Sequence, residues 1–183
     1  MNDLEFQRII QYEFRNKDLL INALTHSSYV NEGKPSHIGN NERLEFLGDA
    51  ILDAVISDYL YNRLGNVEEG ELTKLRAVIV CERSLALCGN RISIGNYLRL
   101  GKGEENSGGR KRGSILADAV EAVIGAIYLD GGWDAAREFV IRTFAELIED
   151  ALCGKLHMDY KTEVQERLQS HGETDICYVI ERE

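Results

Sequence analysis

Apolar residues recur every three or four positions along most of the chain, which is the spacing of one face of an α-helix. The pattern predicts helices near residues 3–12, 17–25, 41–64, 71–92, 115–129 and 133–152. The last two are separated by "DGG" at 130–132, and Ser114 is the expected N-cap of the helix that begins at 115. The sequence therefore predicts an all-α body.

Segments rich in glycine and serine separate these helices. "NEGKPSHIGN" at 31–40 contains the single proline, and both it and "GKGEENSGGRKRGS" at 101–114 are predicted to be loops, the second one flexible. Beyond the body, a helix is expected over 159–169, and "DICYVIE" alternates like a short strand. We expect one domain at 1–152, a linker at 153–158 and the beginning of an α-β unit at 159–183.

The composition excludes several classes of protein. The 183 residues are 44% hydrophobic and 28% charged, as in an ordinary folded protein. No stretch is long enough to cross a membrane, and "MNDLEFQRII" lacks the apolar core of a signal peptide, so we expect a cytoplasmic protein without membrane partners. The four cysteines form no C-x-x-C pair, which favours free thiols. The net charge of −10 argues against a broad nucleic-acid-binding surface.

Acidic side chains share one face of the helix predicted at 41–64. At 100° per residue, Glu42, Glu45 and Asp49 project within about 60° of one another, and Asp53 lies about 20° beyond. The opposite stripe, expected to face the core, consists of Leu44, Leu47, Ile51 and Val55. Apolar side chains also border the acidic arc, namely Phe46, Leu52 and Ile56. We therefore expect a half-buried arc rather than a fully solvated one.

A second pair of acids interrupts "ILADAVEAVIGAIYL" at 115–129, a helix that is otherwise uncharged on every side. Asp118 and Glu121 project within about 60° of each other, with Gly125 between their directions one turn later. A glycine lets another helix approach closely, and Gly48 offers the same opportunity on the first helix. The two helices are therefore predicted to pack with their acids converging.

Converging carboxylates need a partner. Two of them about 5 Å apart repel by about 3 kcal/mol at an effective dielectric constant of 20. Protons, arginines or lysines would relieve this repulsion, but a set of ligands made only of oxygen best suits a hard divalent ion such as Mg²⁺, with Mn²⁺ as a substitute. Because Mg²⁺ in proteins often binds substrate phosphates, we expect a phosphate-containing substrate.

The segment "NERLEFLGDAIL" closely resembles the signature motif of the ribonuclease III family, and the similarity extends to "LLINALTHSSYVNE", "GELTKLRA" and "SILADAVEAVIGAIYLDGG". The resemblance implies an all-helical endonuclease domain that forms a homodimer. It also implies hydrolysis of double-stranded RNA to 5′-phosphate and 3′-hydroxyl ends, in the processing of ribosomal precursor and other RNAs.

The same resemblance assigns roles to individual residues. It implies two Mg²⁺ ions held by four metal ligands, Glu45, Asp49, Asp118 and Glu121. Of these, Asp49 and Glu121 would be catalytic. Glu42 would be an accessory acid, and Phe46 an aromatic knob that enters a socket on the partner subunit.

Basic residues and the C-terminal segment bear on RNA binding. The candidates for RNA contact are Lys74, Arg76, Arg110, Lys111 and Arg112. "DYKTEVQERLQSHG" resembles the first helix of a double-stranded RNA-binding domain, and "ICYVIE" its first strand. Because the chain stops at Glu183, we expect a truncated form of that domain and weak RNA binding.

Three other classes fit parts of the pattern. A related protein that binds RNA without cutting it would be favoured by loss of an acid, and all the acids are present. All-α nucleotide pyrophosphatases also bind Mg²⁺ through paired acids, but those pairs lie much closer in sequence than Glu45 and Asp118. Di-iron four-helix proteins need E-x-x-H, and none of the four histidines has a glutamate three residues earlier.

The remaining conspicuous residues are assigned structural roles. His26 in "LTHSS" has no acid or histidine at ligand spacing, so we expect it to make structural hydrogen bonds. Tyr29 and Asn31 are assigned structural or loop positions. Trp133 is expected to anchor the last helix of the body, and Asp53 to support the acidic arc or face solvent.

Overall fold

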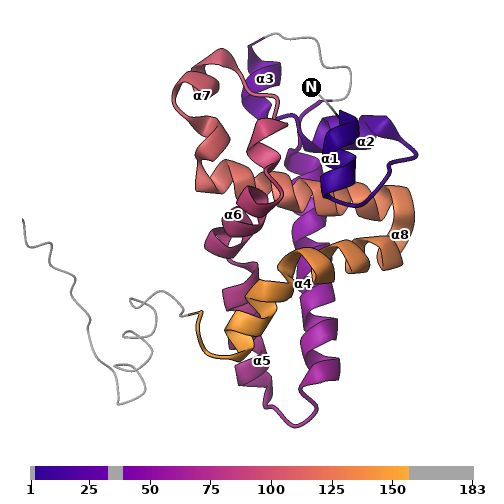
Figure 1. The fold of residues 1–183 in the computed structure, drawn as a ribbon, viewed down its shortest axis with the longest axis vertical. Helices are drawn as coiled ribbons and strands as arrows, with labels where there is room; N and C mark the ends of the chain where they lie inside the picture. Colours follow the sequence, from indigo (N-terminus) through magenta and orange to yellow (C-terminus); the bar gives the residue numbers. More distant parts are fainter. Residues whose placement is uncertain (1–2, 33–38, 157–183) are drawn as a thin grey trace, which may run out of the picture.

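The computed structural model describes residues 3–32 and 39–156, and helices dominate this part of the chain (Figure 1). Its elements are α1 (Asp3–Ile9), α2 (Lys17–Ala23), α3 (Ser27–Asn31), α4 (Glu42–Arg63), α5 (Glu69–Val80), α6 (Glu82–Arg91), the 3-10 turn η1 (Ile94–Asn96), α7 (Lys102–Asn106), the 3-10 turn η2 (Gly109–Lys111) and α8 (Gly113–Leu152). Strand-like pairing in the described ranges is limited to one parallel bridge between Thr25 and Arg99. The predicted all-α class is confirmed.

The second predicted unit cannot be compared with the structure. The expected helix at 159–169 and the strand after it lie outside the described residues. The proposed domain boundary at 152 coincides with the end of α8, and it stays a prediction.

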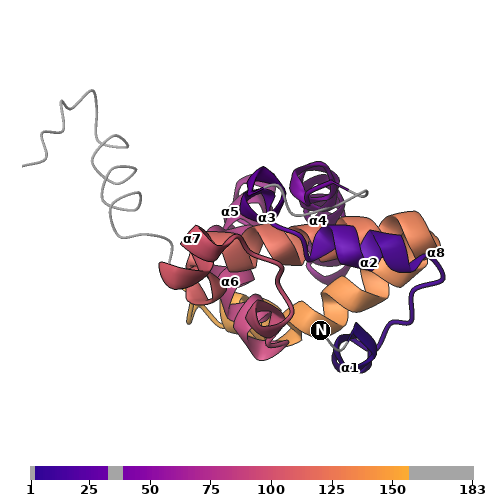
Figure 2. The ribbon, with the colours of Figure 1, turned by 90° about the horizontal axis from the view of Figure 1, so that it is seen from above.

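Helix α8 crosses α4 and then folds back on itself, so that its second half runs back below the first half in the view of Figure 1 (Figures 1 and 2). The bend is at Gly132, whose φ of 81° and ψ of −171° interrupt the helix. Next to it, the Asp130 carboxylate accepts hydrogen bonds from the backbone N–H groups of Arg15 and Asn16 and from the Tyr12 hydroxyl. The break predicted at "DGG" is therefore the point where the N-terminal segment is hydrogen-bonded to α8.

The core explains why the first half of α8 is apolar on every side. That half is packed against α4, α6 and α2, and its residues from Ala119 to Ile127 are buried except for the half-buried Glu121. The second half of α8 adds Phe139 and Phe144, each no more than 1% exposed. A helix enclosed by neighbours on several sides has no face left for polar residues.

Helices α4 and α8 approach each other closely at two glycines. A Cβ atom added to Gly48 would lie 1.8 Å from the Glu121 carbonyl oxygen, and one added to Gly125 would lie 2.4 Å from the Leu44 carbonyl oxygen. No other residue type fits at either position without moving the backbone of the facing helix. The close packing predicted at Gly48 and Gly125 is therefore present.

The buried side of α4 is rotated from the predicted stripe. Leu52 and Ile56, predicted to border the acidic arc, are fully buried, whereas Leu47 and Ile51 remain partly exposed. The cause is Gly48, because the contact with α8 centres on it and turns that side of α4 inward. Glu45 lies on the edge of the buried side, so the expectation of a half-buried arc holds for this residue.

The single helix predicted at 71–92 is wrong. The chain turns at Cys81, which has an extended backbone with a ψ of 156°, and α5 and α6 are separate helices. The Ser84 hydroxyl donates to the Val78 carbonyl oxygen at 2.8 Å and so satisfies the end of α5. Apolar spacing continues through the turn, which is why the sequence pattern does not reveal it.

The flexible loop predicted at 101–114 is also wrong, since this segment contains α7 and η2. Arg110 organises it by donating to the carbonyl oxygens of Gly95 and Leu98 and by forming an ion pair with Glu105. Ser114 is not the N-cap of α8, because the helix already begins at Gly113 and Arg112 occupies the cap position.

Replacing Gly48 by alanine is expected to lower the free energy of unfolding by about 3 kcal/mol, because the new methyl group collides with the backbone of α8. The measurement is urea unfolding followed by circular dichroism. Gly70→Ala in α5 is the matched control, since nothing lies within 4 Å of its added Cβ. Alanine there should raise the stability by up to about 1 kcal/mol. Equal effects of the two substitutions would contradict the role assigned to Gly48.

Candidate active site

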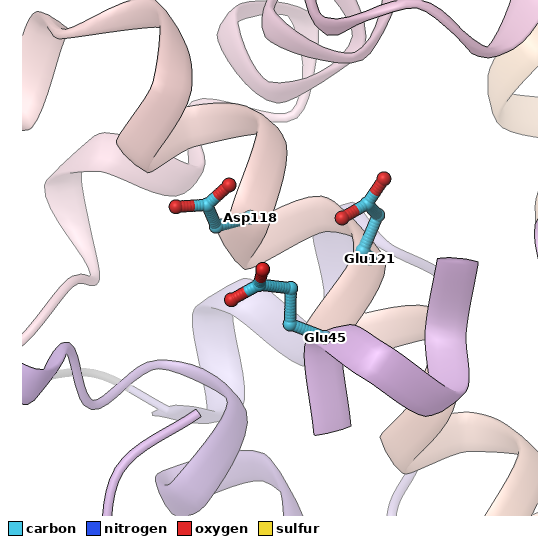
Figure 3. Close-up of side chains that lie close together, drawn as sticks. All are labelled: Glu45, Asp118 and Glu121. Atoms are coloured by element: carbon cyan, nitrogen blue, oxygen red, sulfur yellow. The ribbon is translucent and has the colours of Figure 1, made fainter. Parts of the chain in front are cut away.

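Three carboxylates meet beside the crossing of α4 and α8. Glu45 extends from α4, and Asp118 and Glu121 extend from α8 (Figure 3). Each offers a carboxylate oxygen, and these oxygens all lie within 4.8 Å of one another. All three side chains are half-buried. The structure thus brings together acids from two predicted helices that are distant in sequence.

The electrostatics of this acid cluster (Glu45, Asp118 and Glu121) are unfavourable without a partner. Burial raises the pKa of Glu121 to about 8, and the charges of Asp49, Glu45 and Asp118 contribute to the rise. Burial also raises the pKa of Glu45, followed by the charges of Asp118, Glu42 and Asp49. In the described part of the chain, no arginine or lysine forms an ion pair with a carboxylate of the cluster.

The other acids of α4 surround the cluster. Asp49 is exposed and is not one of the three mutually close carboxylates. Among the neighbouring charges, however, that of Asp49 has the largest effect on the pKa of Glu121. Glu42 is exposed at the start of α4, and Asp53 is half-exposed one turn beyond Asp49. Asp49 therefore lies near the cluster, at its exposed rim.

Two residues outside the predicted acidic arcs also approach the cluster. Burial raises the pKa of Asp118, His26 opposes that rise, and the charge of Glu82 adds to it. Glu82 begins α6 and His26 precedes α3, so neither belongs to the helices that carry the cluster. The helical periodicity of α4 and α8 contains no signal for them, because their positions depend on how α3 and α6 pack.

His26 has the structural role that was predicted. It is the N-cap of α3, where its Nδ1 atom accepts a hydrogen bond from the Ser28 N–H. Tyr29 and Asn31 lie in α3, a helix that the sequence analysis did not predict. Trp133 follows the bend in α8 and is 37% exposed.

The basic residues predicted to contact RNA differ in their exposure and in the bonds that the structure shows for them. Arg110 is engaged in the bonds that organise its own segment, and Arg112 forms an ion pair with Glu104 at 2.6 Å. Arg76 is half-buried and donates to the Ser57 hydroxyl at 3.0 Å. Lys74 and Lys111 are exposed. None of the five belongs to the acid cluster.

The cluster has the chemistry of a divalent cation site. Its donors are carboxylate oxygens, which suit hard ions such as Mg²⁺ and Mn²⁺. The raised pKa of Glu121 shows that the anionic form of this group is poorly stabilised by the protein itself. A cation or a proton has to balance the negative charge of these carboxylates, because the protein does not. The residues present therefore fit a bound metal ion.

Known proteins of one family match most of the chain. A family model described as Ribonuclease-III-like matches residues 16–148. Ribonuclease 3 of Caldanaerobacter subterraneus subsp. tengcongensis is 53% identical over 95% of this chain and 76% of its own length. Ribonuclease 3 of Clostridium acetobutylicum is 52% identical, over 97% of this chain and 76% of its own length.

Solved structures of the same family also match the chain. The nuclease domain of ribonuclease III from Campylobacter jejuni, a structure with flexibility in a region involved in dimer formation, matches with a TM-score of 0.74 and 43% identity. The match covers 79% of this chain and 97% of that domain. Dicer from Pichia stipitis, at 22% identity and a TM-score of 0.55, shares the fold. Among the described residues, no helix is both long and apolar enough to cross a membrane.

The raised pKa of Glu121 predicts how stability depends on pH in metal-free buffer. Between its ordinary value of 4.5 and about 8, the folded protein keeps a proton that the unfolded chain releases. The free energy of unfolding should therefore fall as the pH rises through this window. Urea unfolding in EDTA measures the slope, and Glu121→Gln should flatten it. Identical slopes for the two proteins would contradict the assignment.

Proposed function

The chain belongs to the ribonuclease III family and is an endoribonuclease of that type, and we propose that it hydrolyses the phosphodiester bonds of double-stranded RNA at the acid cluster. The observation that carries the proposal is the convergence of Glu45, Asp118 and Glu121 without a basic partner in the described residues. The expected products carry 5′-phosphate and 3′-hydroxyl ends, and the expected substrates include ribosomal precursor RNAs. The cytoplasmic location stays a prediction.

Divalent cations complete the site in this proposal. Glu45, Asp118 and Glu121 would hold them, with Asp49 as a further ligand from the rim and Glu42 as an accessory acid. Bound Mg²⁺, with Mn²⁺ as a substitute and two ions per site, supplies an activated water and charge compensation for the leaving oxygen. To act as a ligand, Glu121 must lose the proton that its raised pKa favours. Metal binding is therefore expected to release protons.

In this proposal, the protein contacts the sugar-phosphate backbone of the RNA. Duplex RNA is recognised mainly by its shape, its phosphates and its 2′-hydroxyl groups. In a chain of net charge −10, the contacts to phosphate must come from local basic groups or from bound cations. Lys74, Arg76 and Lys111 remain candidates, whereas Arg110 and Arg112 are engaged in the bonds that hold α7 and η2 together.

Replacing Glu121 by glutamine is expected to lower the cleavage rate of long duplex RNA in Mg²⁺ at least about a hundredfold, because a neutral amide is a poor metal ligand. The protein should remain folded, since the change removes an unfavourable charge. A gel assay on duplex RNA, single-stranded RNA and a nucleoside triphosphate, with and without Mg²⁺, measures activity and substrate class.

The control for that substitution is Glu13→Gln, which neutralises an exposed carboxylate outside the cluster. This variant should cleave duplex RNA at the wild-type rate. Wild-type cleavage by Glu121→Gln would remove the assignment of the site. Hydrolysis of the nucleoside triphosphate instead of duplex RNA would indicate a pyrophosphatase.

A homodimer is the second part of the proposal. Phe46 is 80% exposed on α4, which is unusual for a large apolar side chain. A groove of about 410 Å³ lies between α4 and α5, with Leu60, Tyr61 and Leu72 among its lining residues. Phe46 and Tyr61 project from α4 within about 60° of each other and about 22 Å apart along its axis. Two antiparallel copies of α4 would therefore place each Phe46 beside the groove of the other copy.

Replacing Phe46 by alanine is expected to convert the dimer into a monomer, because the side chain that fills the partner's groove is lost. Light scattering at micromolar concentration measures the mass. Leu4→Ala on α1, which also removes an exposed apolar side chain, is the control and should leave the dimer intact. A wild-type protein that is monomeric at this concentration would contradict the proposal.

A further inference from the structure

One edge of the His26 ring is fixed by hydrogen bonds. Nδ1 lies 2.8 Å from the Ser28 hydroxyl oxygen and accepts from the Ser28 backbone N–H at 3.2 Å. The Ser28 hydroxyl oxygen itself accepts from the Gly101 N–H at 2.9 Å, so its own proton is available for Nδ1. With Nδ1 acting as an acceptor, the neutral ring carries its proton on Nε2.

The opposite edge of the ring has no protein partner. Within the described residues, Nε2 of His26 makes no hydrogen bond. No buried side-chain nitrogen or oxygen in this part of the structure lacks a hydrogen-bond partner, so Nε2 must be accessible to solvent. The capping contacts therefore leave His26 with one oriented N–H donor that no residue at 3–32 or 39–156 uses.

Backbone pairing places His26 next to the start of α4, the helix that carries Glu45. The His26 N–H donates to the Arg99 carbonyl oxygen at 3.1 Å, and the carbonyl oxygen of the preceding residue, Thr25, accepts from Asn41 N–H at 2.9 Å. Asn41 in turn accepts from the backbone N–H of Glu45, so His26 lies next to the first turn of α4. The effect of His26 on Asp118 places the ring near α8 as well.

We propose that His26 binds the substrate, its Nε2–H donating a hydrogen bond to a non-bridging phosphate oxygen of the RNA strand at the acid cluster. The inference rests on the proposed function. Once metal binding has displaced their protons, carboxylates accept hydrogen bonds but cannot donate them, so the cluster then offers a phosphate no donor of its own. His26 supplies one from a third element, and the network through Ser28 and Gly101 orients it before the substrate arrives.

Two substitutions separate this role from helix capping. In His26→Asn, the short side chain can still cap α3, because asparagine is a strong N-cap, but it does not reach the position of Nε2. In His26→Gln, the longer amide reaches that position and caps less well. The asparagine variant should keep the wild-type free energy of unfolding and lose about 10- to 100-fold in kcat/KM on duplex RNA. The glutamine variant should recover most of the activity.

A second readout does not depend on cleavage. In ¹⁵N-histidine-labelled protein, the His26 signals, identified by their loss in His26→Asn, should show the Nε2–H form. These signals should shift when duplex RNA is added to the Glu121→Gln protein in Mg²⁺. Wild-type kcat/KM in His26→Asn, equal impairment of the asparagine and glutamine variants, or signals that do not shift would each overturn the role of His26. A wild-type protein that does not cleave duplex RNA would instead refute the proposed function.

Discussion

The contact on which the site depends is the backbone approach of α4 and α8 at Gly48 and Gly125. A methyl group at either position would overlap a carbonyl group of the facing helix, so the two helices meet at a separation that only glycine permits. Glu45 and Glu121 lie within one turn of these glycines. The same packing that closes the core therefore brings like charges together at its edge.

The acid cluster is costly for the folded protein. A chain selected only for stability would place neutral or oppositely charged groups there, since two carboxylates about 5 Å apart repel by about 3 kcal/mol at an effective dielectric constant of 20. Burial of the apolar first half of α8 holds the arrangement in place. The negative charge of the cluster is not balanced by a basic residue of the described part of the chain, and this imbalance is the basis for the proposed cation site.

Some polar residues stabilise the fold, whereas others have atoms that remain available to a ligand. Arg110 and Arg112 form a basic cluster in the sequence, but their bonds to Glu105, Glu104 and two carbonyl groups stabilise the segment of α7 and η2. His26 shows the opposite case, because one ring nitrogen caps α3 while the other remains accessible to solvent. Charge counted along the sequence is therefore a poor guide to which groups can reach a ligand.

The sequence by itself determined the helical class, the facing acids and the two glycines, because each of these follows from spacing along one helix. Only the tertiary structure decided that α5 and α6 separate at Cys81, that Leu52 and Ile56 face inward in place of Leu47 and Ile51, and that Asp49 stands at the rim. It also brought His26 and Glu82 to Asp118. Helical periodicity gives directions within one element, whereas these features depend on how separate elements pack, and local spacing contains no information about that.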